Sequence, residues 1–222
     1  MGLTSTGRIF YKAQEFYQLP GGGSRAGIVA PVIRSTDGGS SWQRAAPLQR
    51  GQVISDPYLY VDPSTDRVFS ADLQENLCGS VSLSDDDGNS WITNPQVCGE
   101  TDHETVFAGP SVTSITVGYP NIVYYCAING GATNLGAAAG CLKSLDGGVT
   151  YAPTGELAYP ARQDESEGPG SYCVGATGHG VVGPDGTVYL PKGWCGQPYL
   201  AISHDEGMTW SRVQVATNGL PL

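Results

Sequence analysis

The chain has 222 residues, 40% hydrophobic and 14% charged, which is enough to bury a core. Eleven Lys and Arg against 21 Asp and Glu give a formal net charge of −10, so the clustered positive charge of a nucleic-acid or anionic-membrane surface is missing. No run of 18 apolar residues is present, so we expect no membrane span. Thirty-two Gly, 15 Pro and the lack of long helical periodicity are typical of short strands joined by tight turns.

Strand-forming stretches occur in four groups along the chain. They lie at 8–11 and 28–33; at 58–61, 67–70 and 80–83; at 105–108, 121–125 and 141–143; and at 180–182, 187–190 and 199–202. The other groups have three stretches, whereas the first group has two and lacks the first of them. We therefore expect the innermost strand of the first group to be missing, and we expect 13–27 to be a long loop. Residues 1–7 lack the basic and apolar regions of a signal peptide, so either a signal was removed or the chain begins inside a longer protein.

A short motif, which we call the repeat turn, follows each group. It reads Ser-x-Asp-x-Gly-x-(Ser/Thr)-aromatic at 35–42, 84–91, 144–151 and 203–210. The Asp carboxylate can accept backbone N–H groups of its own turn, Gly can take a positive φ, and the aromatic ring can pack beneath the turn. We therefore expect structural roles for the four aspartates, Asp37, Asp86, Asp146 and Asp205.

Each unit reads as four antiparallel strands with the repeat turn joining the third strand to the fourth, which is the pattern of a β-propeller blade. The sequence thus predicts an all-β fold with about four blades, at roughly 1–50, 51–100, 101–158 and 159–222, in one domain spanning 1–222.

The four repeat turns resemble those of the Asp-box, or BNR-repeat, superfamily, which includes sialidases, other propeller glycosidases and sortilin-like receptors. Propellers of this superfamily usually have six or more blades, so the resemblance implies that these blades belong to a larger six- or seven-bladed ring. A compact four-bladed ring is the alternative. The resemblance also implies that the site lies on the face opposite the repeat turns, where the blade-to-blade links and second-to-third-strand loops gather; we call it the loop face.

Six cysteines are placed symmetrically about expected hairpin turns. Cross-strand partners lie at equal distances from a turn, so the sequence predicts the pairs Cys78–Cys98, Cys126–Cys141 and Cys173–Cys195. Six buried thiols are the alternative, and the absence of Cys-x-x-Cys disfavours a metal site. Disulfides indicate an oxidising compartment, so we expect a secreted or cell-surface protein.

Several polar residues fall on the expected loop face. Asp56, Asp102 and Glu104 precede or begin first strands and are candidate catalytic groups for glycosidic acid/base work, with strand capping or a bond to the next blade as the alternative. Candidate substrate-binding residues are Arg25, Arg50, His103, Arg162, His179 and Trp194. The histidines have structural or metal-binding alternatives, and Trp194 can stack on a sugar or shield a disulfide. We expect no cofactor, although the acidic run 162–167 leaves Ca²⁺ open against a solvated loop.

Sialidases also carry an arginine on the first strand and a Tyr–Glu nucleophile pair. Residues 7–11 look like the arginine segment, but they align with second strands at 66–69 and 186–189, so Arg8 and Arg67 read as turn-flanking residues. No signature selects the Tyr–Glu pair.

The sequence therefore favours a secreted, sialidase-like propeller acting on glycans, as an exo-glycosidase or a degenerate relative. The alternatives are a non-catalytic carbohydrate- or protein-binding propeller and a sortilin-like receptor.

Overall fold

The computed structural model describes residues 1–18, 26–45, 54–74, 78–94, 97–98, 100–129, 136–164 and 171–216. These residues form strands and turns, and none of them is helical. The described part of the chain thus contains no helix that is long and apolar enough to cross a membrane. Two compact units, Met1–Val97 and Cys98–Leu222, make up the chain and are described separately.

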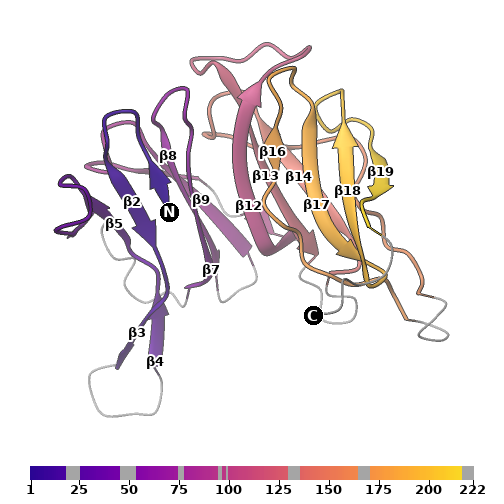
Figure 1. Ribbon diagram of the computed structural model, residues 1–222, viewed down its shortest axis with the longest axis horizontal. Helices are drawn as coiled ribbons and strands as arrows, with labels where there is room; N and C mark the ends of the chain where they lie inside the picture. Colours follow the sequence, from indigo (N-terminus) through magenta and orange to yellow (C-terminus); the bar gives the residue numbers. More distant parts are fainter. Residues whose placement is uncertain are drawn as a thin grey trace. The chain divides into compact units, whose positions relative to one another are not determined.

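The first unit contains two blades (Figure 1). In the first, the strands run in the order β1 (Gly2–Leu3), β2 (Ile9–Lys12), β5 (Val32–Ser35) and β6 (Gln43–Arg44). In the second, the order is β7 (Ile54–Val61), β8 (Val68–Gln74), β9 (Cys78–Ser84) and β10 (Ile92–Thr93), and β11 (Val97–Cys98) also pairs with β9.

The second unit contains two further blades of the same design. The third blade is β12 (Glu100–Pro110), β13 (Asn121–Asn129), β14 (Ala139–Ser144) and β15 (Ala152–Pro153). The fourth is β16 (Val181–Val182), β17 (Val188–Trp194), β18 (Gln197–Ser203) and β19 (Ser211–Gln214). The four strands of each blade pair antiparallel in this order, and each repeat turn joins a third strand to a fourth. The predicted four-stranded antiparallel blades are confirmed.

Two details of the first blade differ from the expectation. Its innermost strand is present, because Gly2 and Leu3 pair with Phe10 and Ile9. A strand of two residues has no periodicity to detect. In addition, the expected loop 13–27 contains an extra hairpin of β3 (Glu15–Gln18) and β4 (Ala26–Val29), and the expected strand 28–33 is interrupted between Val29 and Val32. Pro31 stands in this interruption, where no ladder N–H is required.

The four repeat turns share one hydrogen-bond network. In the first, Ser35 Oγ donates to Asp37 Oδ1 at 2.8 Å, while the N–H and hydroxyl of Ser41 donate to the same carboxylate at 2.8 and 2.6 Å. The N–H of Gly39 donates to Ser35 Oγ at 2.9 Å. The carboxylates of Asp86, Asp146 and Asp205 accept the same set of bonds. These bonds, led by that from the Ser41 hydroxyl, lower the pKa of Asp37 to about 2.

Repeat turns also join neighbouring blades. In the first unit, the Arg34 guanidinium of the first blade donates to the backbone carbonyl of Asp87, in the second repeat turn. The indole N–H of Trp91 reaches the carbonyl of Ala45 at 2.7 Å. Deeper between these blades, Lys12 Nζ and Asp72 Oδ1 form a buried ion pair at 2.6 Å.

The junction of the third and fourth blades is built around Glu206 of the fourth repeat turn. Its buried carboxylate accepts the N–H groups of Val112, Thr113 and Ser114 at 2.7–3.0 Å and pairs with Lys143 Nζ at 3.0 Å. Burial of the carboxyl opposes ionisation, but the hydrogen bonds from Ser114 and its neighbours outweigh it and hold the pKa of Glu206 well below its usual range. One side chain thus fixes the 111–114 loop of the preceding blade.

We expect Glu206→Gln to lower the free energy of unfolding by about 2 kcal/mol, because an amide replaces a charge that accepts several N–H bonds and pairs with Lys143. Urea denaturation followed by tryptophan fluorescence measures this. Glu156→Gln is the matched control, since Glu156 is exposed and contacts the same turn only through its backbone N–H. Equal stability of the two variants would contradict the assigned role.

Candidate functional site

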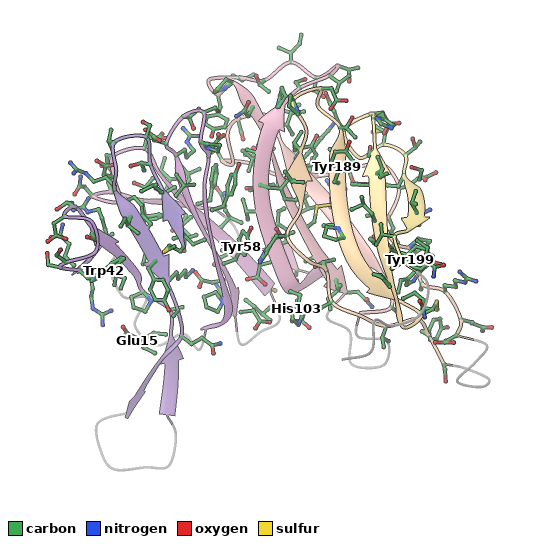
Figure 2. All side chains as sticks on the ribbon, viewed as in Figure 1. Glu15, Trp42, Tyr58, His103, Tyr189 and Tyr199 are labelled. Carbon is green, nitrogen blue, oxygen red and sulfur yellow. A yellow bond between two sulfur atoms is a disulfide. The ribbon has the colours of Figure 1, made fainter. Side chains whose placement is uncertain are left out.

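The loop face of the second unit is marked by a β-bulge at the start of β12. The register between β12 and β13 shifts between Asp102 and Thr105, and His103 between them has a φ of +49°. Non-glycine residues rarely adopt this conformation, and such bulges re-aim side chains at functional sites. His103 is exposed and Asp102 half-buried. Figure 2 shows His103 at the lower end of this unit.

The bulge is held in place by the segment that leads into β16. The hydroxyl of Thr177 donates to the carbonyl of His103 at 2.7 Å, and the N–H of Gly180 donates to Thr105 Oγ1 at 3.2 Å. The exposed His179 lies between these two anchors. The structure therefore brings Asp102, His103 and His179 to the start of the inner strands of two neighbouring blades.

Behind the bulge lie a carboxyl and a phenol. Glu104 is buried, as is Tyr125, which lies on the neighbouring strand. Burial raises the pKa of Tyr125 above its ordinary value, and the charge of Glu104 raises it further. Tyr125 also packs edge-on against Tyr151, with ring centroids 6.4 Å apart. The phenol therefore stays protonated and can donate a hydrogen bond.

The same end of the fourth blade contains a buried lysine that is not among the predicted site residues. Lys192 Nζ donates to the carbonyls of Gly136 and Gly193 at 2.8 and 3.0 Å and lies 5.8 Å from the Tyr159 ring centroid. No carboxylate of the described residues is bonded to it. Burial lowers the pKa of Lys192 to about 8. A lysine in an alternating strand is normally predicted to be solvent-exposed, so the sequence pattern does not indicate that Lys192 is buried.

Trp194 belongs to an aromatic cluster at the rim of this face. It packs edge-on against Tyr159 and Tyr199, and the Arg162 guanidinium lies 5.5 Å from its ring centroid. Trp194 is only 7% exposed, so its ring is buried in this cluster rather than open to solvent. The next residue, Cys195, is bonded to Cys173. Trp194 and Arg162 are thus brought together, with the guanidinium over the indole ring.

The predicted cysteine pairs Cys126–Cys141 and Cys173–Cys195 are disulfides in the structure. Cys78 and Cys98 are disulfide-bonded as well, and no described cysteine is free. The prediction of three bridges by neighbour pairing is therefore confirmed.

The remaining predicted residues belong to the first unit, and two of them lie outside the described residues. Asp56 belongs to the first unit, where it has a φ of +45° in a bulge between Ser55 and Tyr58 that corresponds to the bulge of β12. Arg25 and Arg50 lie outside the described residues. Arg67 forms an ion pair with Asp85 at 2.6 Å, and Arg8 forms one with Asp87 at 3.4 Å. Both arginines therefore lie at the repeat-turn end of their blades, opposite the loop face.

We expect Lys192→Met to change the pH dependence of stability. The folded-state pKa of about 8 lies below the ordinary lysine value of 10.5, so native Lys192 loses its proton first and the protein gains stability as pH rises from about 8. Urea denaturation of both proteins at pH 7.0 and at pH 9.5 measures this. The wild type should gain stability relative to the variant between these two pH values. A constant difference would contradict the assigned pKa.

Comparison with solved structures places this fold among known propellers. A protein of unknown function from Dyadobacter fermentans is 19% identical, with a TM-score of 0.56, over 98% of this chain and 64% of that one. An α-L-arabinanase from Penicillium chrysogenum, solved with arabinobiose, is 15% identical with a TM-score of 0.51, over 94% and 60%. A mutant NanB sialidase from Streptococcus pneumoniae is 9% identical with a TM-score of 0.50, over 93% and 35%.

The chain spans less than two thirds of the length of these three structures. No family model matches it, and no curated protein matches it. At such low identities the likeness establishes the fold, which is an all-β propeller of the kind that glycosidases use.

Proposed function

We propose that this chain is part of a secreted propeller of the Asp-box superfamily that binds and cleaves glycans on its loop face. The observation that carries the proposal is the bulge of β12, where a strained His103 and a half-buried Asp102 lie at the strand that is held by residues 177–180, the segment containing His179. Backbone strain held by specific contacts, here the Thr177 hydroxyl, is characteristic of functional sites.

The residue types at this position suit sugar chemistry. Asp102 would exchange a proton with the glycosidic oxygen or with water, while the two imidazoles would hydrogen-bond sugar hydroxyls. The buried Glu104 and the protonated Tyr125 would support the site from below. Arg162, on the rim, would bind an acidic sugar. Asp56, in the corresponding bulge of the second blade, stays a predicted catalytic residue.

Two further observations support the superfamily and the location. All four repeat turns use the same serine–aspartate network, as expected if they are Asp boxes. The three disulfides require an oxidising compartment, which supports secretion.

Hydrolysis of a panel of fluorogenic glycosides, including sialosides and arabinosides, tests the proposal. We expect Asp102→Asn to lower kcat by roughly 100-fold or more for the substrate that the protein cleaves, since a positioned proton-transfer group contributes about 10²–10⁴-fold. Asp56→Asn is measured in parallel as a second candidate. Glu156→Gln, beside the fourth repeat turn, is the matched control and should keep full activity.

Glycan-array binding by the same proteins separates the two classes of function. Binding that Asp102→Asn and His103→Ala abolish, without hydrolysis of any substrate, would favour the non-catalytic binding propeller. Neither binding nor hydrolysis by the folded protein would overturn the glycan proposal.

A further inference from the structure

Lys192 of the fourth blade has an ammonium group that is buried without an opposite charge. The residue is 2% exposed, and among the described residues its polar partners are two backbone carbonyls. Burial of a cation that has no carboxylate partner costs free energy. Ionisable groups in such surroundings are common at functional sites, so the contacts of Lys192 are a guide to its role.

The ammonium group joins two backbone segments of the loop face. Its Nζ donates to the carbonyl of Gly136, which lies in the connection between β13 and β14, at 2.8 Å. A second bond, of 3.0 Å, goes to the carbonyl of Gly193 at the end of β17. Hydrogen bonds from a charged donor are stronger than those between neutral groups, so Lys192 holds both segments firmly.

A third segment, which leads into β16, rests on the other two. A Cβ added at Gly175 would overlap the carbonyl oxygen of Gly193 at 2.2 Å, and one at Gly136 would meet the backbone oxygen of Gly175 at 3.1 Å. Such close approach of three backbones requires glycine. The position of Gly175 therefore depends on the two segments that Lys192 holds.

The same third segment reaches the bulge of β12. Thr177 forms an isolated β-bridge with Lys192, and the N–H of Gly178 donates to the carbonyl of Pro191 at 2.9 Å. The hydroxyl of Thr177 donates in turn to the carbonyl of His103, the residue with the positive φ, at 2.7 Å. A continuous chain of contacts thus leads from Lys192 through Thr177 to His103.

The charge of Lys192 changes in surroundings with few other ionisable groups. Burial lowers the pKa of Lys192 to about 8. The segments 136–139 and 174–178 contain no titratable side chain. The other described elements packed against Lys192, which are 158–164 and β18, contribute four ionisable side chains, namely Tyr159, Arg162, Asp164 and Tyr199.

We propose that Lys192 is a positioning residue of the candidate site. Its ammonium group holds the backbone on which Thr177 rests, and Thr177 sets the position of His103 and of Asp102 beside it. The inference rests on the proposed function for what the site does, but not for what Lys192 does to the geometry of the site. Loss of the ammonium group leaves two buried carbonyls without this donor, so the segment around Thr177 shifts and the bulge shifts with it.

The ring signals of carbon-13-labelled histidine in NMR spectra report on this chain of contacts, because the protein has three histidines. His103 lies in the bulge, whereas His204 lies in the fourth repeat turn and serves as an internal reference. We expect Lys192→Met to move the His103 signal and to leave the His204 signal in place. In the wild type the His103 signal should also move with a midpoint near the Lys192 pKa of about 8, and the variant should lack this step.

A double substitution tests whether the effect passes through Thr177. Thr177→Val removes the hydroxyl and keeps a similar shape, so in this background Lys192→Met should no longer move the His103 signal. Thr154→Val is the matched control background, because the Thr154 hydroxyl also donates to a backbone carbonyl, that of Cys141, at 3.0 Å. A His103 signal that Lys192→Met leaves unchanged would overturn the proposal, and so would a shift of equal size with and without the Thr177 hydroxyl.

Lys143→Met separates positioning from a general loss of stability. Lys143 pairs with the buried Glu206 at the repeat-turn end of the same unit, so this variant should be less stable and keep the wild-type His103 signal. A His103 shift as large as that of Lys192→Met would mean a merely structural effect and would overturn the proposal.

Kinetics extend the test to the proposed reaction. For a glycoside that the protein cleaves, Lys192→Met should lower kcat by roughly tenfold and change KM less, because a misplaced Asp102 weakens transition-state stabilisation more than binding. An unchanged kcat would contradict the positioning role. If no glycoside is cleaved, the proposed catalysis fails, whereas the histidine signals still decide the role of Lys192.

Discussion

The carboxylate of the repeat turn is the interaction on which the rest of the structure depends. In all four turns it accepts a hydroxyl and an N–H four residues later and a serine hydroxyl two residues earlier, so the turn closes on itself without help from the blade. Because these partners are local, the turn has the same form whether it is covered by another blade or exposed. The other positions of the turn are not needed to close it, so their residues can differ. Gly38 and Glu206 therefore occupy the same position in two different turns.

The residues next to this shared hydrogen-bond network determine how neighbouring blades meet. Asp87 and Glu206 take a left-handed conformation that most residues avoid, and both are contacted by the preceding blade. Glu206 is nearly excluded from solvent and still stays ionised, because three N–H groups and Lys143 surround it. Junctions of this kind are polar where the turn docks and apolar beneath it, as at Phe107 and Gly180. The polar contacts at the turn give each junction specificity, and the apolar contacts beneath the turn still bury hydrophobic surface.

Most of the fold followed from the sequence because its signals are local. The motif, the alternating strands and the symmetric cysteines each act over fewer than 25 residues, so the blades and the disulfides were predictable. The short strand at Gly2–Leu3 and the hairpin of β3 and β4 were missed, since two residues carry no period and Gly-rich segments obscure a strand. The burial of Lys192 could not be predicted from the sequence either, because it depends on a contact with Gly136, which is 56 residues away. Long-range burial of a polar group has no local sequence signature.

The strained backbone at the loop face has a physical counterpart at the opposite end of the blades. Repeat turns tolerate positive φ at Asp87 and Glu206 because hydrogen bonds from the neighbouring blade compensate. At His103 the compensating bond comes instead from Thr177, on the segment that enters the next inner strand. A conformation held by the next blade transmits any shift of that blade to the imidazole and to Asp102 beside it. The geometry of the candidate site is therefore set by blade packing, because the segment that enters the fourth blade holds the bulge of the third.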